Sequence, residues 1–340
     1  MKIFLILLAA VLLPNPATAC DGHGSETVPY LAAAEARKHP GPAESPDKAG
    51  PLRIAYLQND IHHLALWVSL AQGYLTEGKD VEIAGVFRAG PEIMSAFAAG
   101  ALDMAYVGLA PTVTAVANQT AGVVVVSQAN AVGSALVVGV DSTIGAVGDL
   151  KGRTVAIPGH ATVQDFLVKR TLHDHQIDLK SVQMIVLKPP EMITALRSGQ
   201  IDAFIAWEPY PSQAAALKVG RNLIVSREIW PDHPCCVVVA SNRLMAAHLE
   251  KVRAFVTAHR RATDFIRRNP QEALAVAVQY TGLDQETVRQ AMANVDFNDR
   301  LNVASAATYV AFLSDLGYIR IADPDAFIKA LIQPVTITDD

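Results

Sequence analysis

The most unusual residues of this sequence are a histidine and two adjacent cysteines in the stretch His-Pro-Cys-Cys. They are His233, Cys235 and Cys236. Soft thiolates beside an imidazole are good ligands for copper or zinc. Four ligands at a conventional spacing are absent, however, and adjacent cysteines do not readily chelate one ion. We therefore expect no metal site and no cofactor here. Two buried thiols beside a hinge are the main interpretation, and a strained vicinal disulfide is the alternative.

Several other clusters of polar or glycine residues follow expected strands. Such positions are where open α/β sheets bind ligands. The turn before Pro111 and the turn before Thr162 also expose backbone N–H groups at a helix start, which suits an oxyanion. The residues that we expect to contact a ligand are Gln58, Asn59, Asp60, His62, His63, Gly108, Ala110, Pro111, Thr112, Asn130, Ser134, His160, Ala161, Thr162, Trp207, Glu208 and His233.

Each cluster also has a purely structural interpretation. Asn59 or Asp60 is a suitable helix N-cap, and so is Thr162. The stretch around Asn130 could be an ordinary loop, and Trp207 with its neighbour could simply pack at a hinge. Both interpretations stay open for every cluster.

The elements that position these residues alternate between strands and helices. Expected strands lie at 52–57, 81–87, 103–107, 123–127 and 135–140, and again at 150–157, 182–187, 201–206 and 235–240. Expected helices lie at 63–74, 90–99, 111–118, 162–173 and 190–197, with another beginning at Pro209. After residue 240 the pattern becomes wholly helical. Repeated strand–helix–strand order predicts α/β sheets of parallel type with helices on both faces.

The restart of the pattern near residue 150 predicts two α/β lobes. We expect lobe 1 to comprise residues 51–136 plus 238–340 and lobe 2 to comprise residues 137–237, so the chain crosses between them twice. Ligands would bind where the carboxyl ends of the strands of both lobes face a common cleft. Closure of that cleft around a small molecule is the expected motion.

Composition and the N-terminus indicate an exported globular protein. The 340 residues are 51% hydrophobic, and 28 basic against 33 acidic residues give a net charge of −5. This balance argues against nucleic-acid binding, which normally needs a basic excess. Residues 1–19 have the features of a secretory signal. We expect Cys20 to be lipidated and residues 20–50 to form a flexible tether, with ordinary cleavage after Ala19 as the alternative.

Several motifs in order resemble a known family. They are Leu-Arg-Ile-Ala-Tyr at 52–56, Ala-Ala-Gly-Ala-Leu-Asp-Met-Ala-Tyr-Val-Gly at 98–108, Asp-Leu-Lys-Gly-Arg-Thr-Val-Ala at 149–156, Ala-Leu-Arg-Ser-Gly-Gln-Ile-Asp-Ala at 195–203 and Trp-Glu-Pro-Tyr at 207–210. Together they resemble periplasmic substrate-binding proteins of nitrate, sulfonate, taurine and bicarbonate ABC importers. The resemblance covers about residues 51–320. It implies a two-lobed, type II binding-protein fold with a helical C-terminal tail.

The resemblance also implies a function. Such a protein delivers one small molecule to a membrane permease and its ATPase and has no catalytic cycle. In this family an acid at the position of Glu208 can receive an amino group. The expected clusters hold His, Asp and Glu, and Arg88 is the nearest arginine. This composition favours an amino-sulfonate, another zwitterion or a heterocycle such as a pyrimidine.

Two other classes of function remain open. Pyrimidine-synthesising enzymes of thiamine biosynthesis share this two-lobed fold and use a histidine and clustered cysteines, so the His-Pro-Cys-Cys stretch makes them the enzymatic alternative. The export signal argues against that chemistry, and no Gly-x-Ser-x-Gly or His-Glu-x-x-His motif occurs. A ligand-sensing module that signals to a membrane partner is the other alternative.

Overall fold

The computed structural model describes residues 50–335. The predicted signal segment, Cys20 and almost all of the predicted tether lie outside the described residues. Within residues 50–335, no helix combines the length and apolar character that crossing a membrane requires.

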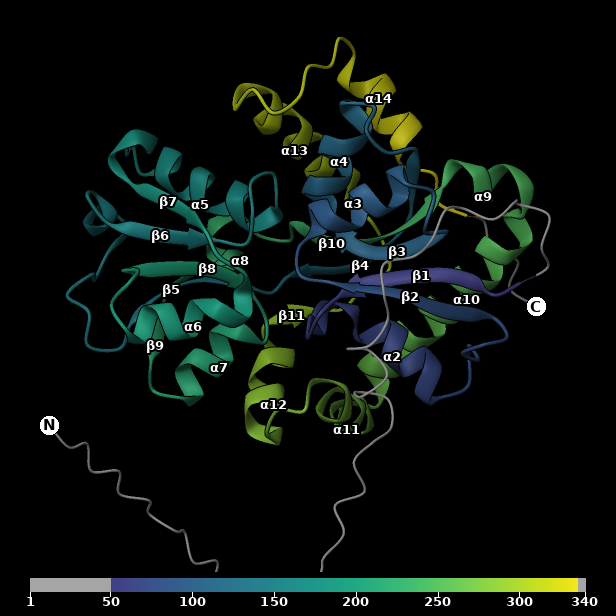
Figure 1. Cartoon of the computed structure of the whole chain (residues 1–340), viewed down its shortest axis with the longest axis horizontal. Coiled ribbons are helices and arrows are strands. Elements are labelled where there is room, and N and C mark those ends of the chain that lie inside the picture. The colour runs from purple at the N-terminus through teal and green to yellow at the C-terminus, as the bar shows by residue number, and fades with distance from the viewer. Residues whose placement is uncertain (1–49, 336–340) are drawn as a thin grey trace, which may run out of the picture. The chain divides into compact units, whose positions relative to one another are not determined.

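The strands form two separate sheets (Figure 1). The first sheet has the order β11-β4-β10-β3-β1-β2 and contains β1 (Leu52–Leu57), β2 (Val81–Phe87), β3 (Met104–Gly108), β4 (Val123–Val132), β10 (Pro234–Ser241) and β11 (Val295–Asp296). The second has the order β7-β6-β8-β5-β9 and contains β5 (Ser134–Gly139), β6 (Thr154–Ile157), β7 (Gln183–Val186), β8 (Ala203–Trp207) and β9 (Gly220–Val225). The chain passes from the first sheet to the second at Gly133 and returns between β9 and β10.

Both sheets are mixed rather than wholly parallel. The pairs β1–β2, β1–β3, β6–β7 and β6–β8 are parallel, as the alternating pattern predicts. The strands next to the crossings run the other way: β10 is antiparallel to β3 and β4, and β5 is antiparallel to β8 and β9. Every residue of β4 and of β10 is buried, because these central strands are covered on both faces.

The helices cover the sheets. They are α2 (Leu64–Ala71), α3 (Gly90–Ala98), α4 (Leu109–Ala117), α5 (Val163–Asp174), α6 (Pro189–Arg197), α7 (Tyr210–Ala216), α8 (Ser226–Ile229), α9 (Asn242–Ala247), α10 (Leu249–Arg268), α11 (Pro270–Thr281), α12 (Gln285–Ala293), α13 (Val303–Asp315) and α14 (Pro324–Leu331). The predicted helical C-terminal region is present. Its α11 packs against α2, and its α12 packs against α7, so the tail contacts helices from both α/β regions.

Candidate functional site

A pocket lies where strands of the two sheets end. It is lined by Leu57, Asp60, His62, Gly90, Gly108, Pro111, Thr162, Val163, Gln164, Trp207, Cys235 and Cys236. These residues come from the carboxyl ends of β1, β3 and β8, from the 3-10 helix Ile61–His63 and its cap Asp60, from the start of β10, and from the first turns of α3, α4 and α5. The free space, open solvent included, is about 280 Å³.

Six residues predicted from the sequence line this pocket, and two others line a second one. The six are Asp60, His62, Gly108, Pro111, Thr162 and Trp207. The second pocket is lined by Gly133, Ser134, Glu208, Val225, Ser226, Arg227 and Asn294, of which Ser134 and Glu208 were predicted. The predicted residues that line neither of these pockets are Gln58, Asn59, His63, Ala110, Thr112, Asn130, His160, Ala161 and His233.

Some of the predicted residues have the structural roles that were left open. The Asp60 carboxylate accepts the His62 N–H at 3.0 Å and caps the short 3-10 helix Ile61–His63. Thr162 caps α5 by accepting the Asp165 N–H at 3.2 Å. Asp60 and Thr162 also line the first pocket, so each residue both caps a helix and contributes to the pocket wall.

Glu208 is held inside the second pocket by neutral donors. Its carboxylate accepts hydrogen bonds from the Asn294 side chain at 2.6 Å and from the Ser212 N–H at 3.2 Å. Burial raises the pKa of Glu208, although these donors oppose the shift. The carboxylate is therefore largely satisfied by the protein.

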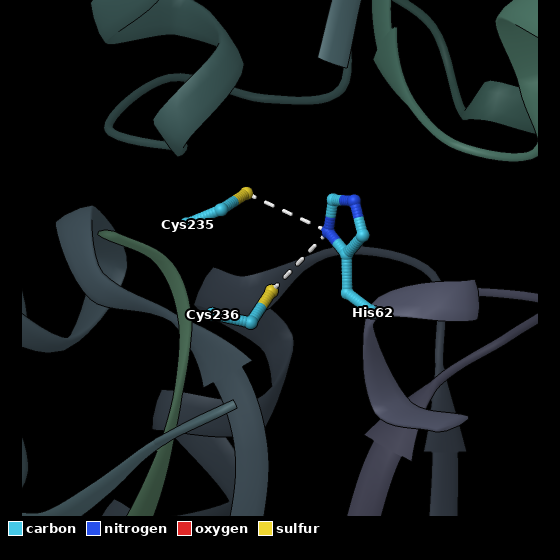
Figure 2. Close-up of side chains that lie close together, drawn as sticks. All are labelled: His62, Cys235 and Cys236. Atoms are coloured by element: carbon cyan, nitrogen blue, oxygen red, sulfur yellow. Dashed lines mark hydrogen bonds between the residues drawn. The ribbon is translucent and has the colours of Figure 1, made fainter. Parts of the chain in front are cut away.

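The two cysteines are buried free thiols, and a histidine from a distant part of the sequence faces them. Figure 2 shows both sulfurs directed at His62. The His62 Nδ1 lies 3.5 Å from the Cys235 Sγ and 3.7 Å from the Cys236 Sγ. His233, two residues before Cys235, places its Nδ1 2.7 Å from the Trp230 carbonyl oxygen, and its hydrogen bond to Cys235 also lowers the pKa of that thiol.

A β-bulge explains how adjacent strand residues face the same histidine. In β10, Pro234 pairs with Ala131 and Cys236 pairs with Asn130, so Cys235 is an extra residue opposite β4. Successive side chains of a regular strand point to opposite faces, whereas a bulge re-aims one of them. The Asn130 side chain stabilises this geometry by accepting the Cys236 N–H at 3.1 Å.

Charge and burial set the protonation of this cluster. Burial raises the pKa of Asp60 to about 7, and the charge of His62 opposes that shift. Burial also disfavours charge on His62, but the Asp60 carboxylate and the Cys235 sulfur outweigh it and raise the pKa of His62 to about 9. A hydrogen bond from Cys236 and the charge of His62 lower the pKa of Cys235, whereas burial raises that of Cys236. One thiolate beside an imidazolium is the favoured state.

An Asp60→Asn variant tests this assignment. Because the carboxylate favours the charged imidazole, its removal should lower the pKa of His62 below about 9. The measurement is an NMR titration of the His62 ring. An Asp202→Asn variant is the matched control, since Asp202 directly precedes β8 of the second sheet and is hydrogen-bonded to Arg153 and the Thr154 N–H. An unchanged His62 titration in the Asp60 variant would contradict the assignment.

Fold and pocket together define a class of protein: two α/β sheets that present strand ends to one pocket form a periplasmic-binding-protein fold. Comparison with solved structures agrees. The alkanesulfonate-binding protein SsuA of Xanthomonas axonopodis pv. citri bound to MOPS superposes with a TM-score of 0.73 at 18% identity, covering 86% of this chain and 100% of that one. The nitrate-binding protein NrtA of Synechocystis PCC 6803 gives a TM-score of 0.72 at 14% identity, covering 85% and 87%.

The chain belongs to the NMT1-like family, whose model matches residues 46–281. A protein of Bacillus subtilis (strain 168) named "Putative aliphatic sulfonates-binding protein" is 27% identical over 214 residues, which are 62% of this chain and 63% of that one. The chain thus spans a little over three fifths of the length of that relative. The resemblance and the fold class predicted from the sequence are confirmed.

Proposed function

We propose that this protein is the solute-binding component of an ABC importer and that it acts by binding rather than by catalysis. The solute would be a small polar molecule held in the first pocket. Two lobes, one built around each sheet, would close around it. Relatives and structural neighbours that bind sulfonates or nitrate support this function.

The observation that carries the proposal is the set of donors around the pocket. Gly90, Gly108 and Val163 mark the N-terminal ends of α3, α4 and α5, and all three residues line it. Helix N-termini present backbone N–H groups and a partial positive charge to anions. The Trp207 indole Nε1 is buried in the same wall and has no hydrogen-bond partner.

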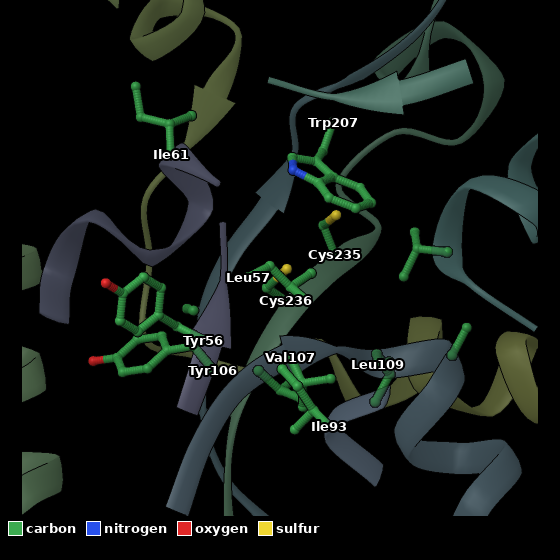
Figure 3. Close-up of a cluster of buried hydrophobic side chains, with 14 of the residues drawn as sticks. Tyr56, Leu57, Ile61, Ile93, Tyr106, Val107, Leu109, Trp207, Cys235 and Cys236 are labelled. Atoms are coloured by element: carbon green, nitrogen blue, oxygen red, sulfur yellow. The ribbon is translucent and has the colours of Figure 1, made fainter. Parts of the chain in front are cut away.

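These features favour a solute with an anionic or strongly polar head. Trp207 stands over Cys235 in Figure 3 and gives the pocket an apolar face beside its free N–H. Asp60 supplies an acid that a cationic group could approach. A sulfonate, an amino-sulfonate such as taurine, another zwitterion, nitrate, bicarbonate or a pyrimidine-like heterocycle meets this description, and the sulfonate-type head is preferred because its oxygens can accept from several donors at once.

The partners and location follow from the same proposal. A membrane permease and its ATPase would receive the solute. The N-terminal signal would direct the chain to the periplasm, where a lipid on Cys20 would anchor it to a membrane. Nucleic acid is no part of the proposal.

A thermal-shift screen tests solute binding. The full chain is heated with alkanesulfonates, taurine, nitrate, bicarbonate and pyrimidines in turn. A solute that binds only the folded state at one hundred times its dissociation constant stabilises it by about 2.7 kcal/mol, so a clear rise in melting temperature is expected with one class. No shift with any compound would contradict the proposal.

Trp207→Phe is the site-specific variant for this screen. It keeps an aromatic ring but removes the unpartnered N–H, so we expect solute affinity to fall about tenfold, which is the worth of one good hydrogen bond. Trp67→Phe is the matched control, because the Trp67 Nε1 is also buried without a partner but its ring stacks on Tyr280 away from the pocket. An equal loss of solute affinity in the two variants would show that the solute does not contact Trp207.

A further inference from the structure

We propose that His62, Cys235 and Cys236 form a binding site for one copper(I) ion. The three side chains are buried, and their ligand atoms all lie within 4.8 Å of one another. Two of these residues are adjacent in the sequence and the third is more than 170 positions away, so the site exists only in the folded chain. This inference goes beyond the proposed function, because it holds whichever organic solute the pocket takes.

The distances between the ligand atoms suit a shared ion. With zinc as the reference, bonds of about 2.3 Å to sulfur and about 2.0–2.1 Å to nitrogen place the two ligand atoms about 3.6–3.8 Å apart at tetrahedral to trigonal angles. The His62 Nδ1 lies 3.5 Å from one sulfur and 3.7 Å from the other. An ion could therefore be seated with little movement of these side chains.

The other nitrogen of His62 is occupied in the way that metal-binding histidines require. The His62 Nε2 lies 2.9 Å from the Gly133 carbonyl oxygen and donates its hydrogen there. Metal-ligating histidines usually donate their second ring N–H to a carbonyl or a carboxylate, which fixes the ring and directs the free nitrogen at the metal. Here that free nitrogen is Nδ1, and it faces both sulfurs (Figure 2).

The bulge in β10 supplies the second independent observation. The expectation that adjacent cysteines cannot chelate one ion assumes a regular strand, in which they would point apart. The register shift at Cys236 removes that objection, and the Asn130 side chain holds the bulge by accepting the Cys236 N–H. Bulges next to sites commonly serve to re-aim a side chain.

Ligand type and number favour copper(I) over the alternatives. Thiolate and imidazole are soft or intermediate donors that select copper(I) and zinc over magnesium or calcium. Three converging ligands complete a trigonal copper(I) site. The four ligands that structural zinc sites use would require the Asp60 carboxylate, which lies 3.5 Å from the His62 Nδ1 and is a harder donor than thiolate. Both sulfurs bind as thiolates. Because Cys235 is already the thiolate, the ion displaces the Cys236 proton and the proton on the His62 Nδ1 to solvent, and no oxidation or reduction is involved.

The test is a competitive titration under anaerobic conditions. The full chain carries Cys20→Ser throughout, so that only Cys235 and Cys236 contribute thiols. After reduction with a phosphine, copper(I) is added against the colorimetric chelator bicinchoninate. We expect one copper(I) retained per chain, with sulfur and nitrogen neighbours in its X-ray absorption spectrum. That spectrum needs no ligand variant and so does not depend on whether the variants fold.

Substitutions then locate the ion. His62→Ala, Cys235→Ser and Cys236→Ser each remove a ligand of the ion. Losing only a hydrogen-bond partner of a metal ligand costs roughly 10–100-fold in affinity, so we expect each of these variants to weaken copper(I) binding by more than that. His160→Ala is the matched control, because His160 is exposed and lies outside the cluster. Circular dichroism checks that each variant is folded.

The proposal would be overturned if the reduced chain retained no copper(I), or if retention were unchanged in all three cluster variants. It would also be overturned if a parallel titration with zinc showed tighter binding of zinc than of copper(I). The organic-solute screen contains no metal. Its failure would therefore count against the importer function alone, and failure of the copper titration would count against this site alone.

Discussion

A Gly133→Ala variant should lose about 3 kcal/mol of unfolding free energy, because alanine is strained there in two ways. Gly133 has a φ of +90°, a conformation that L residues rarely adopt. An added Cβ would also overlap the His62 Nε2 and come within 2.8 Å of the Val295 side chain. Urea unfolding measures the loss.

The same substitution should disturb the site. The Gly133 carbonyl accepts the His62 Nε2–H and also the Glu208 N–H, each at 2.9 Å, at the point where the chain passes between the sheets. Gly199→Ala is the matched control, since Gly199 has a φ of +72° but open space around its Cβ position. We expect that variant to lose only about 1 kcal/mol. Equal losses would show that contact with His62 adds nothing to the strain.

Between neutral pH and about pH 5, the wild-type protein should lose about 2 kcal/mol more unfolding free energy than a His259→Gln variant. His259 is fully buried in the first α/β region. Its Nε2–H donates to the Gln128 carbonyl at 2.8 Å, and its Nδ1 accepts the Tyr106 hydroxyl at 2.9 Å. Burial lowers the pKa of His259 to about 4, so the folded state keeps this ring neutral.

The sign follows from proton uptake. Below its ordinary pKa of 6.5, His259 takes up a proton in the unfolded chain but not in the folded one until about pH 4. Stability is therefore lost as the pH falls through this window. Asp60, whose pKa is raised to about 7, changes stability in the opposite direction. Urea unfolding at each pH therefore gives the unfolding free energy of wild type and variant, and the difference between the two isolates the contribution of His259. A difference that does not change with pH would contradict the expectation.

The hydrophobic pattern of the sequence predicted most of the strands and helices, and the strands that it missed or cut short have physical causes. The strand expected at 123–127 continues to Val132, although Ser127, Gln128 and Asn130 look like loop residues. Their backbones complete the pairing with β10, and Asn130 bonds to neighbouring backbone groups. The edge strand β9 and the two-residue β11 were not predicted, since short or half-polar strands lack a clear alternation.

The caps Asp60 and Thr162 were predicted from the sequence, whereas breaks within regular segments were not. Gly100 and Gly199 adopt positive φ after their helices, as helix-ending glycines do. The helical segment expected after residue 240 is divided at His248, which lies between α9 and α10 without a proline or glycine to signal the break. The boundary there depends on packing that a linear pattern does not contain.

The site was predicted in part for a similar reason. Strand-end logic selected Gly108, Thr162 and Trp207, because the carboxyl ends of strands can be read from the order of elements. It could not pair His62 with the two cysteines, since that contact depends on a bulge and on a long-range fold. Gln164 was also missed, although its place two residues after the predicted helix cap could have indicated a pocket side chain.

The most direct test of the central claim is a calorimetric titration of the full chain with the solute that gives the largest thermal shift. Wild type is compared with Gly108→Val, which adds a side chain to the pocket wall within 3.1 Å of the Val163 side chain. Gly148→Val is the matched control, because its Cβ position has nothing within 4 Å. We expect one solute per chain, lost in the Gly108 variant and kept in the control. Undiminished binding by Gly108→Val would contradict the placement of the solute in this pocket.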